Sequence, residues 1–363
     1  MNRSSSREES LCDVLQLEAG TGKEKIIMSK VRWGIIGSGG IARKRTIPGL
    51  LMAQNAECVA VMDVNETLLK EVQEQFGISR GYTSVEELLA QEDIDAVYIA
   101  TPVFCHKEQV QKAAEAGKHI LLEKPMGLTC AQGQEIIEIC EKNGVKLGVG
   151  FMMRFHAAHQ KVKELIAEGT IGEVVSAYAK FNCWSPVSNQ KWRQTKAFSG
   201  GGSMMDMGIH CIDLLQYMTG MQATAVAAMS GNQIFAYPDV EDGASAVMRM
   251  ENGALFTVEA NFNIPDSIGG CRFEIYGTKG RITAEGTIGQ VETGSLVVST
   301  LDHPETAEVD YVSGNMYTKE IEGFSRAVLE NGPVPVTAEE GVFDQMVVEA
   351  VYESQEKGTH IIF

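Results

Sequence analysis

Hydrophobic positions in the first part of the chain alternate between short, fully apolar runs and longer stretches with helical spacing. The apolar runs predict buried strands at residues 31–36, 58–62, 96–100, 119–122 and 145–150. The stretches between them predict amphipathic helices at residues 41–53, 66–76, 85–90, 107–116 and 131–141. Repeated strand–helix–strand units imply a parallel sheet with right-handed crossovers, which binds ligands at the carboxyl ends of its strands.

The pattern changes after residue 150. Helices are predicted at 157–168 and, after the glycine cluster 200–202, at 204–218, with a strand at 174–182. Alternating apolar and polar positions then indicate one large, mainly antiparallel sheet from residues 224–229, 244–250, 254–262, 272–276, 281–284 and 290–298. Helices at 319–330 and 338–355 close the chain. We therefore expect an α/β protein with a ligand-binding domain at 31–150 and an α+β domain at 151–363. The last helix of the second domain can pack back on the first domain.

The first thirty residues follow neither pattern. They begin with a polar run, Ser4 to Ser10, and contain no apolar core of the kind that a secretory signal needs. We predict a disordered extension at 1–30, with Met28 as an alternative natural start. No apolar run elsewhere approaches the roughly 18 residues of a membrane-spanning helix, so we expect a cytoplasmic protein.

Charge and cysteine content narrow the partners. The chain carries 31 basic and 48 acidic residues, a formal net charge of -17, which disfavours nucleic acid and anionic membranes as partners. The eight cysteines form no CxxC pair and no cluster with zinc-site spacing. We expect reduced thiols and no metal site.

A glycine-rich loop joins the first predicted strand to the first helix. Gly37 permits a tight turn, Gly39 lets a pyrophosphate approach the backbone, and Ala42 keeps the helix close to the strand. The helix N-terminus then presents unpaired N–H groups to the phosphates. The predicted dinucleotide-binding residues are therefore Gly37, Ser38, Gly39, Gly40, Ile41 and Ala42.

Asp63 ends the second predicted strand, about twenty residues beyond the glycine loop. A carboxylate at this position accepts hydrogen bonds from the adenosine ribose and repels a 2′-phosphate, so it favours NAD over NADP. The alternative is an ordinary turn residue at a strand end.

Two further strand ends carry candidate residues. Thr101 and Pro102 follow the third strand, where side chains reach a cofactor; His106, close behind, is either a cofactor contact or a residue that starts a helix. Glu123 and Lys124 follow the fourth strand, and Pro125 restricts Lys124 to an extended backbone. The Lys124 ammonium could polarise a carbonyl or hold a hydroxyl, whereas a surface lysine is the alternative.

Asp206 and His210 are four residues apart, which places them on one face of the predicted helix. His210 titrates near neutrality and can take a hydroxyl proton, and Asp206 can orient the same hydroxyl; a structural histidine is the alternative. Trp192 and Arg193 lie in a polar loop, where their side chains could bind a sugar, a nicotinamide or a phosphate. The alternative is a surface loop that Trp192 anchors to the protein.

Taken in order and spacing, these motifs resemble the glucose-fructose oxidoreductase and inositol dehydrogenase (Gfo/Idh/MocA) family over nearly all of residues 31–363. The resemblance rests on Gly37, Ile41 and Ala42, on 100–102, on 116–119 leading to 123–125, on 200–202 leading to Asp206, Gly208 and His210, and on 352–354. It implies a Rossmann domain, an open antiparallel sheet that forms homodimers or homotetramers, and hydride transfer between nicotinamide and a sugar, inositol or related polyol.

By position, the resemblance makes Lys124 the catalytic lysine, His210 the acid/base and Asp206 its partner. It places Trp192 and Arg193 on a loop that faces the cofactor and the substrate, and it directs Arg154 towards the substrate. The methionines at 152–153 depart from the family pattern, which usually has an asparagine or a second arginine there.

Two other functions fit the same scaffold. One is an NAD-dependent glycosidase that oxidises its sugar transiently and leaves no net redox change. Such an enzyme would retain NAD on purification and cleave glycosides without added cofactor. The other is a cofactor-sensing regulator; such relatives lose catalytic residues, whereas Lys124, Asp206 and His210 are all present here.

Overall fold

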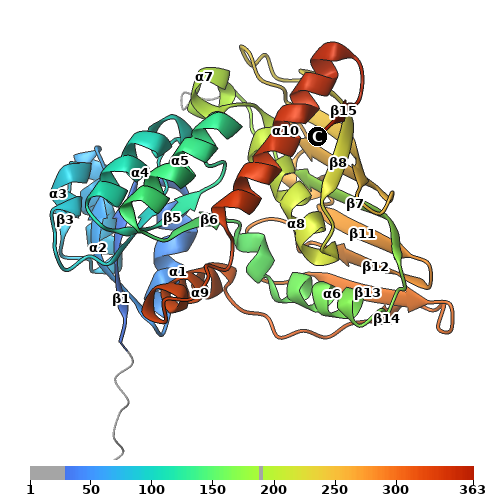
Figure 1. Ribbon diagram of the computed structural model, residues 1–363, viewed down its shortest axis with the longest axis horizontal. Helices are drawn as coiled ribbons and strands as arrows, with labels where there is room; N and C mark the ends of the chain where they lie inside the picture. Colours follow the sequence, from blue (N-terminus) through green and yellow to red (C-terminus); the bar gives the residue numbers. More distant parts are fainter. Residues whose placement is uncertain (1–28, 188–190) are drawn as a thin grey trace, which may run out of the picture.

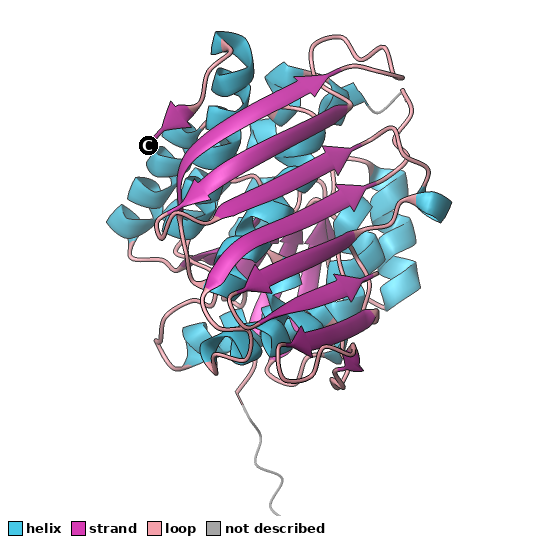
Figure 2. Ribbon diagram, turned by 90° about the vertical axis from the view of Figure 1, so that its right-hand side faces the viewer, coloured by secondary structure: helices cyan, strands magenta, loops and turns pink. Residues whose placement is uncertain are grey.

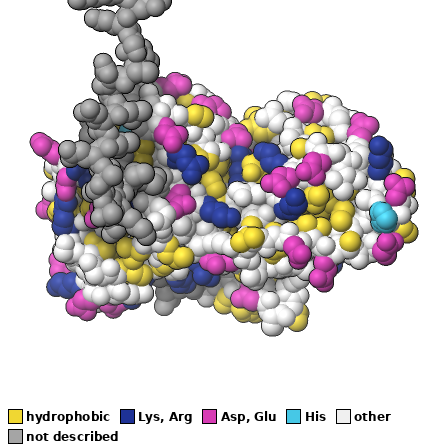
Figure 3. All heavy atoms as spheres, turned by 90° about the horizontal axis from the view of Figure 1, so that it is seen from below, with side chains coloured by type: hydrophobic (Ala, Val, Ile, Leu, Met, Phe, Trp, Pro, Cys, Tyr) yellow, Lys and Arg dark blue, Asp and Glu magenta, His cyan; other side chains and the backbone are white. Residues whose placement is uncertain are grey.

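The computed structural model describes residues 29–187 and 191–363, in which two β-sheets lie side by side with helices between and around them (Figure 1). The predicted extension at 1–30 lies outside the described residues except for its last two positions. Seen from below, the molecule has two lobes, and acidic and basic side chains are interspersed over the part of this face that grey atoms do not cover (Figure 3). No helix in the described part of the chain has the length and apolar character needed to cross a membrane.

The first sheet is parallel throughout, as expected, and its described strands run in the order β3-β2-β1-β4-β5-β6. They are β1 (Val31–Ile36), β2 (Ala56–Met62), β3 (Gly81–Tyr82), β4 (Ala96–Ile99), β5 (His119–Glu123) and β6 (Leu147–Gly150). The helices are α1 (Ile47–Met52), α2 (Glu66–Phe76), α3 (Val85–Leu89), α4 (His106–Glu115) and α5 (Cys130–Asn143). Neighbouring residues of β1 enter different cores: Ile35 belongs to the cluster that contains residues of α1 and α2, and Ile36 to the cluster that contains residues of α3, α4 and α5.

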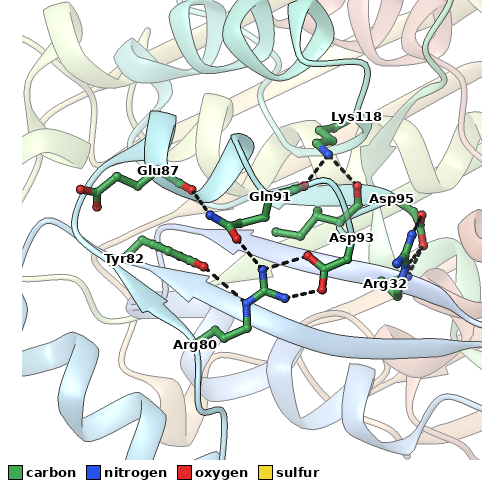
Figure 4. A network of polar contacts seen from close by, with 9 residues as sticks. Arg32, Arg80, Tyr82, Glu87, Gln91, Asp93, Asp95 and Lys118 are labelled. Atoms are coloured by element: carbon green, nitrogen blue, oxygen red, sulfur yellow. Dashed lines mark hydrogen bonds and ion pairs between the residues drawn. The ribbon is translucent and has the colours of Figure 1, made fainter.

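The amino ends of these strands are tied together by a polar network (Figure 4). Arg32, at the start of β1, pairs with Asp95 before β4 at 2.7 Å, and the Nζ atom of Lys118, before β5, donates to the carbonyl of Ile94 at 2.8 Å. Arg80 pairs with Asp93 in the same network. Because the glycine loop lies at the opposite, carboxyl ends of the strands, this network supports the fold and leaves the ligand edge open.

The second sheet runs in the order β14-β13-β12-β11-β7-β10-β9-β8-β15 among the described residues. Its strands are β7 (Val174–Asn182), β8 (Ala223–Gly231), β9 (Gly243–Met250), β10 (Leu255–Asn261), β11 (Arg272–Gly277), β12 (Gly280–Glu285), β13 (Ser295–Thr300), β14 (Ala307–Glu308) and β15 (Ile361–Ile362). The sheet is antiparallel except at β7 and β10, which pair in parallel. The chain leaves the sheet after β7 for a long helical excursion, so a later strand can return beside it in the same direction.

Helices cover the inner face of this sheet, whereas no helix of the described residues lies in front of its outer face (Figure 2). The helices and helical turns of the second half are η3 (Met152–Phe155), α6 (Ala157–Ala167), η4 (Lys191–Gln194), α7 (Lys196–Ser199), η5 (Met204–Gly208), α8 (Ile209–Thr219), η6 (Asp266–Ile268), α9 (Met316–Leu329) and α10 (Ala338–Lys357). The predicted helix at 204–218 is therefore continuous but begins with the π-helical turn η5. A similar turn, η1 (Ala42–Thr46), opens the first helix.

The two final helices join the two sheets. α9 packs on the first sheet, where the Phe324 ring lies 5.4 Å from that of Trp33 and the Trp33 indole donates to Ser325 at 3.0 Å. α10 lies between α5 and β8. The two helices thereby hold the sheets against each other, with the carboxyl ends of the parallel strands next to the end of β7.

Candidate active site

A cleft of about 880 Å³ opens between the two sheets, within the range of small-molecule sites. Its walls come from the carboxyl ends of the parallel strands, from the end of β7 and from η5 and α8. The residues of the sequence analysis that line it are Gly37, Gly39, Gly40, Ile41, Asp63, Thr101, Pro102, Glu123, Lys124, Trp192, Arg193, Asp206 and His210.

The glycine loop has the shape that a dinucleotide requires. Gly37 has φ +86°, and a Cβ atom there would lie 2.8 Å from the Thr101 side chain. A Cβ on Gly39 would lie 2.9 Å from Leu68, so this position favours glycine. The backbone there carries no side chain, which lets a pyrophosphate approach it. Ser38 and Ala42, which were also predicted to bind the dinucleotide, are buried and do not line the cleft; Ala42 keeps only its other predicted role, that of holding the helix close to the strand. These residues fit a nicotinamide dinucleotide.

Asp63 stands beside this loop at the end of β2. Its Oδ1 atom accepts from the backbone N–H of Asn65 at 3.0 Å, and its Oδ2 atom is 3.8 Å from the place a Gly39 Cβ would take. One carboxylate oxygen is thus fixed by the turn and the other is left for a ligand in the cleft.

Lys124 and Asp206 meet across the cleft. The Lys124 Nζ donates to Asp206 Oδ1 at 3.1 Å and to the Asp206 carbonyl at 2.7 Å. The Arg193 Nε lies 3.8 Å from Asp206 Oδ2, and its guanidinium stacks 4.1 Å above the Trp192 ring. Burial alone would raise the pKa of the Asp206 carboxyl, but Lys124 and Arg193 outweigh it and lower that pKa to about 2.

His210 lies on the turn after Asp206, packed between aromatic rings. Phe151 meets it edge-on at 5.8 Å and Phe181 lies at 6.2 Å. Burial first, and then the positive charge of Lys124, lower the pKa of His210 well below its ordinary value. The structure therefore does not favour the expectation that His210 titrates near neutrality, because both burial and the charge of Lys124 oppose the imidazolium.

His106 is a structural residue and not a cofactor contact. It is buried at the start of α4; its Nε2 atom faces the Thr101 carbonyl at 3.0 Å and its Nδ1 atom faces the Pro125 carbonyl at 3.1 Å. It thus ties the end of β4 to the turn after Lys124 without lining the cleft. The more ordinary of the two interpretations, a residue that starts a helix, describes it better.

Arg154 is likewise turned away from the cleft. The η3 turn after β6 directs it to α8 and α10, where its Nε atom donates to Asp213 at 2.8 Å and its Nη1 atom to Glu340 at 2.7 Å. Arg154 and Asp213 are both buried. The predicted direct contact with substrate is wrong because this side chain is held in an internal ion-pair network.

The structure adds residues that the sequence motifs did not single out. Tyr317 of α9 lines the cleft, and its hydroxyl is buried with no hydrogen-bond partner among the described residues. Tyr98 donates a short hydrogen bond to Glu123. Asn182 and Asp266 line the wall formed by the second sheet. No local motif marks Tyr317, Asn182 and Asp266, because they reach the cleft only through the packing of distant elements; Tyr98 is buried and contacts the cleft residue Glu123 without lining the cleft itself.

Comparisons with known proteins identify the family of the chain. The sequence model of the oxidoreductase family with an NAD-binding Rossmann fold matches residues 31–151, and that of the GFO/IDH/MocA C-terminal domain matches residues 159–283. The chain is 30% identical to a 1,5-anhydro-D-fructose reductase of Ensifer adhaerens, over 90% of this chain and 97% of that protein. It is also 30% identical to D-xylose 1-dehydrogenase (NADP(+)) 2 of Haloferax volcanii, over 91% of this chain and 98% of that protein.

A solved structure shows the same architecture. The complex of levoglucosan dehydrogenase with NADH and levoglucosan is similar to this chain with a TM-score of 0.83 and 26% identity, over 92% of this chain and 99% of that one. The family models meet nearly end to end along the sequence, and the relatives match from end to end. The chain belongs to the Gfo/Idh/MocA family of oxidoreductases, with an NAD(P)-binding Rossmann domain at its amino-terminal end.

Proposed function

We propose that this protein is an NAD-dependent oxidoreductase that moves a hydride between nicotinamide and a carbon of a sugar, inositol or related polyol. The observation that carries the proposal is the meeting of Lys124, Asp206 and His210 in a cleft that also contains the glycine loop. The names of relatives that act on anhydrofructose, xylose and levoglucosan support the same substrate class.

The protein side chains handle the hydroxyl group that reacts. A bound nicotinamide supplies or accepts the hydride. Lys124 uses two of its three N–H groups on Asp206, which leaves one for the substrate oxygen. Asp206 keeps the ammonium in place, Lys124 supports the acid–base chemistry at that oxygen, and His210 lines the cleft beside them.

Asp63 supports NAD as the cofactor. Its free carboxylate oxygen suits the ribose hydroxyls, and its negative charge opposes the 2′-phosphate of NADP. Because one relative is named for NADP, this preference is a property to be measured on this chain.

We also propose a homodimer or homotetramer formed through the outer face of the large sheet, in the cytoplasm. Val247 of β9 and Leu255 of β10 are 42% and 51% exposed on that face, between inward-facing buried residues. The described cysteines are all free thiols, in keeping with a reducing compartment.

The test is a panel of neutral sugars, inositols and polyols, assayed for oxidation with NAD and, as the matching carbonyl compounds, for reduction with NADH. We expect turnover of at least one panel member and a loss of about 100-fold or more in kcat for Lys124→Met, since general acid–base groups contribute about 10²–10⁴-fold. Lys142→Met, an exposed lysine of α5, is the matched control. Unchanged turnover in Lys124→Met, or no turnover of any panel member by the wild type, would contradict the proposal.

A further inference from the structure

The carboxylate of Asp206 is engaged on both oxygens by cations. Oδ1 accepts from Lys124, and Oδ2 faces Arg193. The backbone carbonyl of Asp206 also accepts a hydrogen bond from Lys124. In a triad where histidine carries a proton, a carboxylate accepts from one ring nitrogen and stabilises the imidazolium. Here Asp206 is committed to Lys124 and Arg193, and no hydrogen bond joins it to His210 among the described residues.

The ring of His210 offers one nitrogen to the cleft. Its Nδ1 atom is buried and has no hydrogen-bond partner among the described residues. Since His210 lines the cleft, Nε2 is the nitrogen left to face it. A carbonyl substrate in the cleft offers only an acceptor, so the tautomer that can bind it carries its proton on Nε2 and leaves Nδ1 unprotonated.

The surroundings of the ring oppose a second proton. Phe151 and Phe181 pack against it from the ends of β6 and β7, and the charged groups that face it are Lys124 from β5 and Asp206 from its own turn. Lys124 repels an imidazolium, and the charge of Asp206 is already balanced by Lys124 and Arg193. Burial and Lys124 therefore oppose a charged histidine, and among these groups only the charge of Asp206 favours one.

We propose that His210 stays neutral throughout the reaction and donates a hydrogen bond from Nε2 to the substrate oxygen, while Lys124 alone exchanges the proton. This inference rests on the proposed function. In the reducing direction, the carbonyl carbon gains a hydride from the reduced nicotinamide, a Lys124 N–H bond breaks, and a substrate O–H bond forms. Lys124 then regains a proton from water in the cleft, and oxidation follows the same path in reverse.

Two substitutions of His210 distinguish a hydrogen-bond donor from a general base. Gln keeps an N–H donor at a similar reach but cannot take up a proton, whereas Ala has neither function. We expect His210→Ala to lose about 100-fold in kcat, as when one oxyanion donor is removed, and His210→Gln to stay within about tenfold of wild type. His303→Gln, on an exposed loop, is the control. Equal losses in His210→Gln and His210→Ala, with thermal unfolding unchanged, would overturn the proposal.

A direct readout needs no turnover. In protein labelled with ¹⁵N-histidine, the signals that vanish in His210→Gln report the ring of His210. We expect them to show the neutral Nε2–H tautomer from pH 5 to pH 8. An imidazolium or an Nδ1–H tautomer in that range would overturn this proposal even if the protein turns over sugars. A neutral Nε2–H ring in a protein that turns over no sugar would instead refute the proposed function alone.

Discussion

The hydrogen bond between Asp63 and Asn65 leaves a single carboxylate oxygen beside the glycine loop. Replacing Asp63 with Ser removes the charge that opposes a 2′-phosphate and keeps a small polar side chain. We expect the ratio of the Kd for NADPH to the Kd for NADH to fall about tenfold or more, because one uncompensated charge near a phosphate costs about 1–4 kcal/mol at surface-like dielectric constants.

Fluorescence titration with NADH and NADPH measures both constants. Glu74→Ser, an exposed acid of α2, is the control for a general change of surface charge. The assignment of Asp63 fails if its replacement weakens both cofactors equally or leaves the ratio unchanged.

Single residues near strand ends show what the sequence could and could not predict. Lys124, Asp206 and His210 were all predicted, and the structure brings them together. His106 and Arg154 follow strand ends too, yet both are buried in structural networks. Proximity to a strand end along the sequence does not fix the direction of a side chain; that direction depends on the turn that follows and on which helices receive it.

At the scale of elements, Arg154 links three separate segments. It lies on η3 and pairs with Asp213 of α8 and Glu340 of α10, so it holds the helix that carries His210 against the last helix. Burial raises the pKa of Asp213, and Arg154 opposes that rise. Arg154→Met leaves a buried carboxylate without its cation, and we expect a loss of about 3–5 kcal/mol in the free energy of unfolding.

Urea unfolding at neutral pH measures this loss. Lys161→Met, which removes an exposed ion pair with Glu164 on α6, is the matched control and should change stability by less than about 1 kcal/mol. A loss in Arg154→Met no larger than that of the control would show that the network contributes little to the fold.

Periodicity predicted most elements closely, including short ones such as α3, β4 and β5, and missed the two-residue strands. β1, β7 and α2 have the predicted bounds, because their apolar spacing and flanking turns agree. The strand expected at 290–298 begins only at Ser295, since Gly289 and Gly294 both have positive φ and interrupt the strand. β3, β14 and β15 are two residues long and carry no periodic signal; they form because a neighbouring strand offers an edge.

At the scale of the whole molecule, the outer face of the large sheet is the surface that we expect to pair with another copy. Val247 and Leu255 lie on adjacent strands of that face, and both are exposed. The double substitution Val247→Glu and Leu255→Glu places two like charges on each copy, so we expect it to dissociate the oligomer into monomers.

Light scattering coupled to gel filtration gives the molar mass. Leu301→Glu, on an exposed loop after β13, is the control and should leave the oligomer intact. A wild type that is monomeric at micromolar concentration, or a double variant with unchanged mass, would contradict this assignment of the interface.

The arrangement of the two sheets makes one cleft out of groups that are far apart along the chain. The parallel sheet brings the glycine loop and Lys124 to one edge, and η5 brings Asp206 to face them. The sequence indicated each half and predicted that the last helix can pack back on the first domain. The distance between the halves also depends on α9, for whose packing the sequence carried no recognisable signal.

The central claim is direct hydride transfer between nicotinamide and a carbon of the substrate, and isotope transfer tests it most directly. NADH carrying deuterium on one face of C4 is incubated with the protein and the best carbonyl compound of the panel, and the product is examined by NMR. We predict one deuterium on the new carbinol carbon for each NADH consumed, from one face of C4 only. Consumption of substrate with no net loss of NADH, or a product whose carbinol carbon carries only protium from either labelled face, would contradict the account.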